Sequence, residues 1–255
     1  MTKKIRIAVS GANGKMGKKV IENLFKFKNI KLTSVLIKKK TKLKLKNKLL
    51  TKIYKKLNFS YCIKKIINFF DVLIDFTSPE SSVSYAHICS LYKKKIVIGT
   101  TGFNIDQINL LKLYSKKTGI VISENYSIYA NILFKLLKNK YFLNSSKNIK
   151  IIEKHHKSKI DKYSGTSIRI KKTILNSNNN QKNVFIKNIK IIPIRNKKDI
   201  GSSHIIVFFR NGESLTICHR VKNRSVYALG AIKSALWIYK KERGIFNSNN
   251  ILKKN

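Results

Sequence analysis

The sequence predicts an α/β fold with a doubly wound parallel sheet, followed by a second domain of the α+β class. Three observations support this prediction. Short apolar runs alternate with helix-length segments in the first half of the chain, a glycine-rich turn follows the first run, and strand-like runs prevail beyond the midpoint. Alternating strands and helices are typical of a parallel sheet with helices on both faces. A chain of 255 residues that is 43% hydrophobic can bury one large core or two modest ones.

The first half of the chain alternates strand and helix patterns. It starts with a strand, because Ile5, Ile7 and Val9 alternate with charged or small residues, and apolar residues from Val20 onward then recur at helical spacing. The further elements expected there are strands at 30–37, 71–77, 95–103 and 120–125 and helices at 81–94 and 104–119. Serines open the first of these helices, and Gly119 is expected to stop the second.

The pattern changes after residue 126. The expected elements are a long apolar helix at 127–143, a strand at 149–156, a helix at 164–177, a polar loop at 176–183, antiparallel strands at 184–197 and 203–221, and an amphipathic helix at 225–241. Gly212 is expected to supply the positive φ of a hairpin turn. The expected division is a first domain at 1–126, on which the 225–241 helix packs back, a second domain at 127–224, and a tail at 242–255. Within that tail, SNNILKKN (248–255) is expected to be frayed.

The chain is strongly basic, with 55 Lys and Arg against 11 Asp and Glu and a net charge of +44. Such a charge raises nucleic acid or an anionic membrane as a partner. The lysines are spread along the whole chain and mixed with Asn and Ile, as A+T-rich codons produce, so nucleic acid is not the expected partner. No apolar run is long enough to cross a membrane, and no leader pattern is seen at the start, so we expect a cytoplasmic protein.

A glycine-rich turn links the first strand to the first helix. The turn comprises Gly11, Ala12, Asn13, Gly14, Lys15, Met16 and Gly17. The first glycine permits a tight turn, the second lets the backbone approach a pyrophosphate, and the third allows close helix–strand packing. The N–H groups at the helix N-terminus then face the phosphates. This context predicts a Rossmann-like dinucleotide-binding domain, against the alternative of a glycine turn without a ligand.

The end of the second strand bears on the choice of cofactor. An acidic residue about twenty residues beyond the glycines would bind a ribose hydroxyl of NAD. Here Ile37 is followed by Lys38 and two further lysines, which favours NADPH over NADH because cations suit a 2′-phosphate. The alternative is that these lysines only belong to the general excess.

Small residues end the fourth predicted strand, where Gly99 is followed by Thr100 and Thr101. In an open α/β sheet, ligands bind just beyond the carboxyl ends of the strands. The two threonines either reach a nicotinamide or a substrate there, or form an ordinary strand-to-loop turn.

The segment from 151 to 170 carries two adjacent histidines, a lysine and a Ser-Gly-Thr triplet. His155 and Lys159 are four positions apart and share a face in a strand or a helix. Each lowers the proton affinity of the other, which suits proton donation near neutral pH. The triplet Ser164–Thr166 opens a helix whose N–H and hydroxyl groups suit a carboxylate. The combination fits a small dianionic substrate that receives a proton, against the alternative of surface histidines and an ordinary N-cap.

No metal and no disulfide are expected. The spacing of His155, His156 and His219 or Cys218 matches no zinc pattern. The cysteine count of three is odd and includes no C-x-x-C pair, so the thiols are expected to be reduced.

These motifs, in this order along nearly the whole chain, resemble the 4-hydroxy-tetrahydrodipicolinate reductase (dihydrodipicolinate reductase) family. The resemblance rests on VSGANGKMG, DVLIDFTSPE, VIGTTGF, ENYSIYANILFKLL, EKHHKSKIDKYSGT and CHRVKNRSVYALGAIKSALW. The family pattern E-x-H-H-x-x-K-x-D-x-x-S-G-T is complete here, as Glu153, His155, His156, Lys159, Asp161, Ser164, Gly165 and Thr166. The resemblance implies a homotetramer that catalyses an NAD(P)H-dependent reduction in lysine and diaminopimelate biosynthesis. The product would be tetrahydrodipicolinate.

The resemblance also implies a role for each matching residue. His155 would be the proton donor and acceptor, and Lys159 the second proton donor. The remaining roles are the dinucleotide site at Gly11, Gly14, Lys15, Met16 and Gly17, the nicotinamide surroundings at Gly99, Thr100, Thr101, Asn125 and Tyr126, and the substrate carboxylate site at His156, Lys159, Ser164, Gly165 and Thr166. The first domain would bind the dinucleotide, and the second would bind a small dicarboxylate and form the oligomer.

The chain departs from the family at a few positions. Ile37 replaces the acidic ribose ligand, Tyr129 replaces a glycine, and Tyr163 replaces the proline before Ser-Gly-Thr. Two alternatives stay open at this stage. One is another Rossmann reductase acting on an amino-acid intermediate, and the other is a degenerate basic Rossmann protein that binds nucleic acid or another anionic partner.

Overall fold

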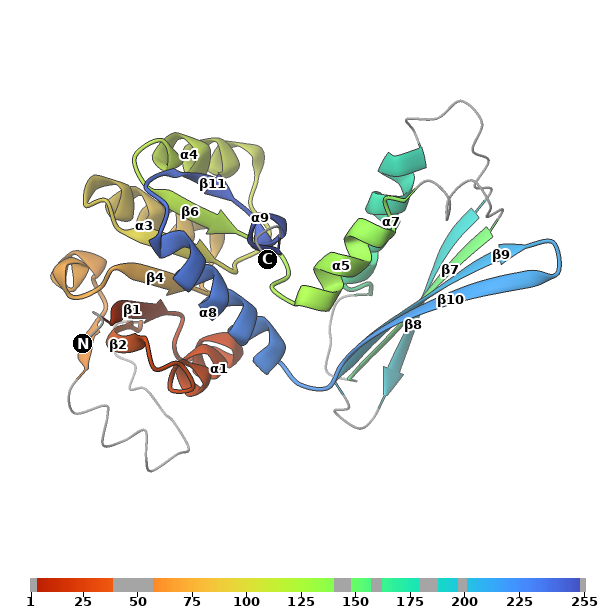
Figure 1. The fold of residues 1–255 in the computed structure, drawn as a ribbon, viewed down its shortest axis with the longest axis horizontal. Helices are drawn as coiled ribbons and strands as arrows, with labels where there is room; N and C mark the ends of the chain where they lie inside the picture. The colour runs from red at the N-terminus through yellow and green to blue at the C-terminus, as the bar shows by residue number, and fades with distance from the viewer. Residues whose placement is uncertain are drawn as a thin grey trace. The chain divides into compact units, whose positions relative to one another are not determined.

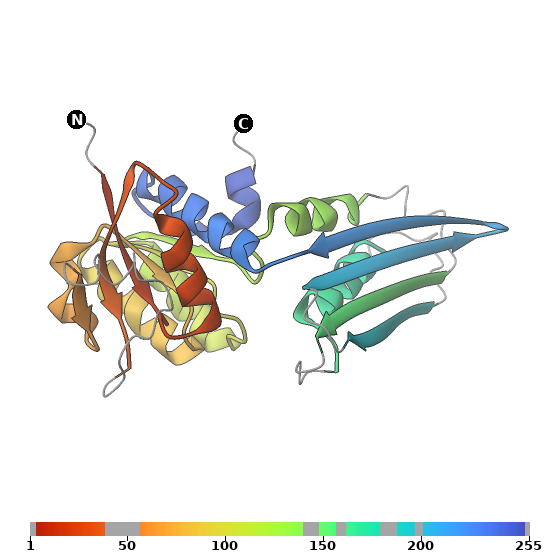
Figure 2. The same ribbon diagram turned by 90° about the horizontal axis from the view of Figure 1, so that it is seen from below.

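The structure is a computed structural model that describes residues 4–38, 57–139, 148–156, 162–178, 188–196 and 201–252. It divides into two compact units, one of Met1–Tyr126 with Ser225–Asn255 and one of Ser127–Arg224 (Figures 1 and 2). Within the described ranges, no helix has both the length and the apolar character needed to cross a membrane.

The first unit is built on a seven-stranded sheet with the order β11-β6-β5-β4-β1-β2-β3. All neighbouring strands run parallel. The strands are β1 (Ile5–Ser10), β2 (Ile30–Leu36), β3 (Asn58–Ser60), β4 (Val72–Asp75), β5 (Lys95–Ile98), β6 (Gly119–Ile122) and β11 (Gly244–Phe246). The chain winds outward from β1 in one direction and from β4 in the other, so the predicted doubly wound parallel sheet is confirmed.

Helices cover both faces of this sheet (Figures 1 and 2). They are α1 (Lys15–Leu24), α3 (Pro79–Leu91), α4 (Ile105–Ser115), α8 (Ser225–Tyr239) and α9 (Ser248–Leu252), with short 3-10 turns η1 (Ile63–Lys65) and η2 (Ile67–Phe69). One buried core joins α1 and α8 to the sheet, and a second joins α3 and α4 to the other face. The strands therefore read as continuous apolar runs, because both of their faces are buried.

The second unit is a four-stranded mixed sheet with the order β10-β9-β7-β8. Its elements are α5 (Ile128–Leu136), β7 (Asn148–His156), α7 (Gly165–Asn178), β8 (Asn188–Asn196), β9 (Ser202–Arg210) and β10 (Glu213–Val221). One core cluster joins α5 and α7 to one face of the sheet. The predicted hairpin is present between β9 and β10, where Asn211 and Gly212 adopt φ values of 27° and 88°. A mixed sheet packed on helices agrees with the predicted α+β class.

The strand predicted at 184–197 is not antiparallel to its neighbour. β8 pairs with β7 in parallel, from Asn148↔Asn188 to His156↔Asn196. The physical reason is that α7 lies between the two strands in the chain, and a helical crossover returns the chain to the end of the sheet where the previous strand began. The remaining partner of β7 is β9, which does run antiparallel.

Several predicted boundaries are wrong. Gly119 does not stop a helix, because α4 already ends at Ser115 and Gly119 is the buried first residue of β6. A side chain there would meet Ile238 of α8 at 2.9 Å, so the glycine serves packing. The apolar helix from 127 is shorter than predicted, with a turn after Leu136. The predicted loop at 176–183 overlaps the last turn of α7, and its remainder from residue 179 lies outside the described residues.

The predicted frayed segment 248–255 is helical over Ser248–Leu252, and residues 253–255 lie outside the described residues. Gly244–Phe246 add a parallel strand beside β6, and Ser248 begins the short helix α9. Two contacts account for this order. The ring of Phe246 stacks edge-on against Trp237 at 5.0 Å between centroids, and Ser123 donates a hydrogen bond of 2.8 Å to the hydroxyl of Ser248.

Substitution of Gly230 in α8 should destabilise the protein. A Cβ at this position would lie 1.9 Å from the carbonyl oxygen of Tyr126. Although alanine favours a helix, Gly230→Ala should lower the free energy of unfolding by about 1–3 kcal/mol, because the overpacked backbone must shift. Urea denaturation measures this. The control is Lys233→Ala on the exposed side of the same helix, which should stay within about 0.5 kcal/mol of the unaltered protein. Equal stability of the two variants would contradict the packing argument.

Candidate active site

The glycine turn of the first unit is tightly packed against the sheet. Gly11 has a φ of 68°, and a Cβ there would lie 2.2 Å from the carbonyl oxygen of Phe76. A Cβ on Gly17 would lie 2.2 Å from the carbonyl oxygen of Gly11. The N–H of Gly14 donates to that same oxygen at 2.9 Å. Only glycine fits at the first and third positions, as the motif predicts.

Helix α1 begins directly after this turn. Its N-cap is Gly14, which offers no side-chain hydrogen bond, and its first turn contains no acidic residue. Lys15 is exposed there, and Met16 packs at the edge of the core. Because no side chain caps the helix, its N-terminal N–H groups and partial positive charge suit a phosphate. These residues therefore fit the phosphates of a dinucleotide.

A buried carboxylate lies at the same edge of the sheet. Asp75 ends β4 and is fully buried. Its oxygens accept hydrogen bonds from Ser10 at 2.5 Å, Thr77 at 2.7 Å and Thr100 at 3.4 Å, and from Ser82. Burial raises the pKa of Asp75, and the four hydroxyl groups oppose that shift. Sequence reasoning missed Asp75, although an acidic residue that closes an apolar strand run is a signal for it.

The predicted nicotinamide residues also lie at this edge, after β5 and β6. A Cβ on Gly99 would lie 2.1 Å from the ring of Phe76, so that ring covers the glycine. Thr100 is buried, and its hydroxyl takes part in the Asp75 network, whereas Thr101 is exposed. The first threonine therefore fixes the loop, and the second is the one open to a ligand.

Asn125 and Tyr126 follow β6 and are both buried. The hydroxyl of Tyr126 donates to the carbonyl oxygen of Ile98 at 2.7 Å. Asn13 is exposed in the glycine turn, and Lys38 is exposed just after β2. Since β2, β1, β4, β5 and β6 are parallel neighbours, all the residues predicted to bind the cofactor lie at one edge of one sheet.

In the second unit, strand register gathers polar residues on one face. β9 pairs His204 with Glu153 of β7 on one side and with His219 of β10 on the other. The ring centroids of His155 and His204 are 5.4 Å apart, and those of His204 and His219 are 6.0 Å apart. Burial lowers the pKa of His219, which favours its neutral form. Three histidines therefore form a row beside Glu153.

Sequence reasoning missed His204 and His219 as members of this row. The hairpin contained the signal, because a two-residue turn at Asn211 and Gly212 pairs His204 with His219. Each also bonds a serine, with 3.1 Å between the Ser164 hydroxyl and His204 Nε2 and 3.4 Å between the Ser127 hydroxyl and His219 Nε2.

The predicted substrate residues lie where α7 begins. Ser164 precedes the helix, and its hydroxyl accepts from the N–H of Ser167 at 3.1 Å, as an N-cap does. Gly165 starts the helix, and a Cβ added there would meet no atom within 4 Å. The helix end is thus accessible to a ligand. Thr166 follows in the same turn, His156 is the last residue of β7, and the predicted proton donor Lys159 lies outside the described residues.

Glu153, His155 and His204 offer possible metal ligands within 4.8 Å of one another. The carboxylate of Glu153 is already engaged, since Arg195 Nη1 donates to Oε1 at 3.1 Å and the N–H of Ser164 donates to Oε2 at 2.8 Å. A guanidinium beside the carboxylate opposes a second cation. The cluster therefore suits proton transfer and anion binding better than metal binding.

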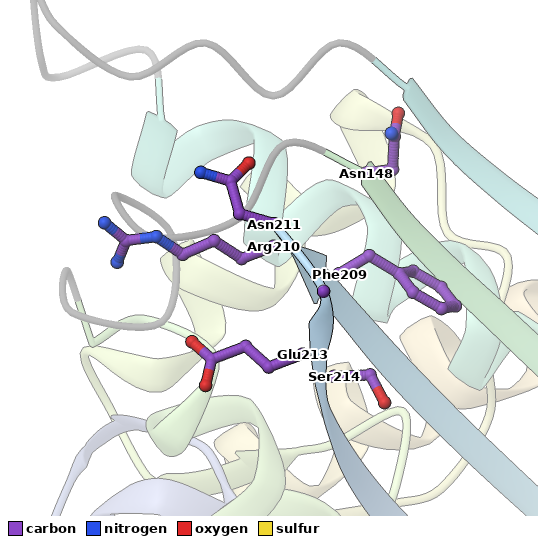
Figure 3. A pocket seen from close by; sticks show the side chains of 7 residues that line it. Asn148, Phe209, Arg210, Asn211, Glu213 and Ser214 are labelled. Atoms are coloured by element: carbon purple, nitrogen blue, oxygen red, sulfur yellow. The ribbon is translucent and has the colours of Figure 1, made fainter.

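A cavity of about 490 Å³ lies at the end of the β9–β10 hairpin (Figure 3). It is lined by Asn148, Phe209, Arg210, Asn211, Gly212, Glu213 and Ser214. None of these residues was predicted to bind cofactor or substrate, and no residue of the histidine row lines it.

Comparison with known proteins gives a consistent result. The family described as "Dihydrodipicolinate reductase, N-terminus" matches residues 5–126, and "Dihydrodipicolinate reductase, C-terminus" matches residues 130–252. The 4-hydroxy-tetrahydrodipicolinate reductase of Wigglesworthia glossinidia brevipalpis is 48% identical, over 98% of this chain and 94% of that protein. The enzyme of the same name from Buchnera aphidicola subsp. Cinara cedri is 40% identical, over 100% of this chain and 99% of that protein.

A solved structure shares the fold. The dipicolinate-bound dihydrodipicolinate reductase from Paenisporosarcina sp. TG-14 superposes with a TM-score of 0.76 at 22% identity, over 96% of this chain and 99% of that chain. At this identity the likeness shows the fold alone.

The buried carboxylate of Glu153 should make stability depend on acid pH. Burial raises its pKa, but hydrogen bonds from Ser167, Ser164 and Arg195 outweigh that effect and lower the pKa to about 2, from an ordinary value of 4.5. The stabilisation is therefore present above pH 4.5 and is lost as the pH falls towards 2. Between pH 7 and pH 3, the unaltered protein should lose about 2 kcal/mol more unfolding free energy than Glu153→Gln does.

Urea denaturation at a series of pH values measures this difference. The matched control is Glu22→Gln, which removes an exposed carboxylate paired with Lys19 on α1. That variant should follow the pH dependence of the unaltered protein. The linkage argument is wrong if Glu153→Gln follows it too.

Proposed function

This chain belongs to the dihydrodipicolinate reductase family, and on that premise we propose how its residues reduce 4-hydroxy-tetrahydrodipicolinate to tetrahydrodipicolinate with a nicotinamide cofactor. The resemblance inferred from the motifs is confirmed by profiles that cover most of the chain. The observation that carries the proposal is the histidine row beside the start of α7, which supports a proton donor next to a helix end that would bind an anion. The alternative of a basic protein that binds nucleic acid gains no support from relatives named as reductases over nearly the full chain.

The first unit supplies the cofactor site in this proposal. The close packing of Gly11 and Gly17 leaves the backbone of the turn open to a pyrophosphate, and the uncapped start of α1 favours its charge. A bound nicotinamide dinucleotide supplies the hydride. The loop after β5 is held by the bond between Thr100 and Asp75, so that Gly99 and Thr101 line the nicotinamide together with Asn125 and Tyr126.

The second unit supplies the substrate site. His155 donates the proton, with Lys159 as the second donor. The start of α7 at Ser164, Gly165 and Thr166 holds a carboxylate together with His156. The partly buried position of His155, beside His204 and Glu153, fixes its ring for proton transfer.

NADPH is the cofactor that we propose to be preferred. The support is the absence of an acidic residue just after β2, where Ile37 and the exposed Lys38 stand instead. A lysine in this place suits a 2′-phosphate and offers nothing comparable to a ribose hydroxyl.

We further propose a homotetramer in the cytoplasm. The face of the second sheet opposite α5 and α7 carries apolar side chains that remain partly exposed, namely Ile152, Ile192, Ile194, Ile205, Val207 and Phe209. Such a row on one sheet face supports association with other copies of the chain. The three cysteines are free thiols, which fits a reducing compartment.

Removal of either proposed proton donor should leave cofactor binding intact and slow the reaction. His155→Gln and Lys159→Ala should each lower kcat by about 100-fold or more, because general acid catalysis contributes factors of this size. The assay follows NADPH consumption with the fresh aldol product of pyruvate and aspartate semialdehyde. The control is His87→Gln, an exposed histidine that stacks on Tyr114 of α4. Near-normal turnover in both test variants would refute the assignment.

Cofactor preference can be tested separately. The unaltered protein should show a higher kcat/KM with NADPH than with NADH. Lys38→Ala should reduce that preference by about two- to fivefold, since the charge is exposed and screened. Lys31→Ala, at the other end of the same strand, is the matched control and should leave the ratio unchanged. A clear preference for NADH in the unaltered protein would contradict the prediction.

A further inference from the structure

Arg195 of β8 points to the same side of the sheet as the candidate catalytic residues. The parallel register pairs it with His155, and it pairs the neighbouring Pro193 with Glu153. Residues two apart in a strand share a face, so Glu153, His155 and Arg195 all lie on one side of this sheet. The side chain of Arg195 is 22% exposed and that of Glu153 is fully buried.

The guanidinium group of Arg195 joins a side-chain carboxylate, that of Glu153, to a backbone carbonyl group, that of Lys162. Arg195 Nη1 donates to Glu153 Oε1 at 3.1 Å, and Nη2 donates to the carbonyl oxygen of Lys162 at 2.8 Å. The planar fork of arginine allows both bonds at once, which the single ammonium of lysine does not reproduce. The second oxygen of Glu153 accepts from the N–H of Ser164 at 2.8 Å.

These bonds fix the chain on both sides of Tyr163. The carbonyl group of Lys162 and the N–H of Ser164 are tied to the same ion pair, so the backbone that enters α7 has little freedom. Ser164 is then held from a third direction by His204. The ion pair therefore sets the position of the helix end whose accessible residue is Gly165.

We infer that Arg195 is a positioning residue, which acts through Glu153 and Lys162 to hold the first turn of α7 in the orientation that receives a substrate carboxylate. The inference rests on the proposed function, because it takes the start of α7 as the carboxylate site. It adds a residue outside the E-H-H-K-D-S-G-T pattern, contributed by a strand about thirty residues further along the chain.

Binding of a planar dicarboxylate to three variants tests this inference. The probe is dipicolinate, which the Paenisporosarcina protein binds. Isothermal titration would give its Kd, and the Kd of NADPH, for Arg195→Gln, Arg195→Lys and the control Arg210→Gln. The control removes the same charge from an exposed arginine at the end of β9. All measurements are made below the lowest Tm of the set, since Glu153 without its partner lowers the stability of the protein.

The Kd of Arg195→Gln for dipicolinate should rise by about 10- to 100-fold, because a small misplacement of a binding group has effects of this size. The Kd for NADPH should not change. The Kd of Arg195→Lys for dipicolinate should lie between those of Arg195→Gln and the unaltered protein. The Kd of Arg210→Gln should match that of the unaltered protein. In turnover, KM for the substrate should rise by a larger factor than kcat falls. If Arg195 had a purely structural role, its substitution would lower Tm but would not raise KM by a larger factor than it lowers kcat.

Unchanged dipicolinate binding by Arg195→Gln overturns the inference. If that variant does not fold, Arg195→Lys decides, and a Kd equal to that of the unaltered protein overturns the inference as well. If the proposed function is wrong and the inference is right, the unaltered protein should show no turnover, although Arg195→Gln still binds dipicolinate more weakly than it does. An unaltered protein that does not bind dipicolinate at all overturns both.

Discussion

The buried carboxylate of Asp75 holds together the edge of the parallel sheet at which the cofactor-binding residues gather. It accepts hydrogen bonds from hydroxyl groups that belong to β1, to the loop after β4, to α3 and to the loop after β5. A charge buried without partners would be very costly, so the four donors and the carboxylate depend on one another. The glycine turn packs against this network, because Gly11 contacts the carbonyl group of Phe76, the residue after Asp75. The geometry of the whole edge therefore depends on a residue that need not touch a ligand.

The second unit also contains a buried carboxylate that joins several elements through hydrogen bonds. Glu153 is as deeply buried as Asp75, and its oxygens are likewise satisfied by groups from several elements. The outcome differs, because hydrogen bonds from Ser167, Ser164 and Arg195 together lower the pKa of Glu153, whereas burial prevails at Asp75 and raises its pKa. In a chain with only 11 acidic residues against 55 basic ones, one buried carboxylate in each unit thus holds the predicted binding residues of that unit in place.

The sequence predicts local features well, and it predicts pairings only where a turn sets the register. The glycine spacing predicts the turn before α1, and Gly212 predicts the hairpin between β9 and β10, because each feature depends on residues close in the chain. The parallel pairing of β8, the strand at Gly244–Phe246 and the network around Asp75 were not predicted. The last two depend on contacts between segments far apart in sequence, whereas the helix predicted between the strands at 149–156 and 184–197 already favoured their parallel pairing. The row of histidines is an intermediate case, since hairpin register alone would have paired His204 with His219.

The first unit is discontinuous, and this has a consequence for biosynthesis. Its core includes α8, and its sheet includes β11, both of which are encoded after the entire second unit. The second unit is continuous and can be completed first. The sheet face that α1 and α8 share is therefore covered by α1 but not by α8 while the ribosome synthesises the intervening hundred or so residues. The core of the first unit is therefore completed only after the C-terminal segments have been synthesised, and the apolar residues that α8 covers stay exposed until then.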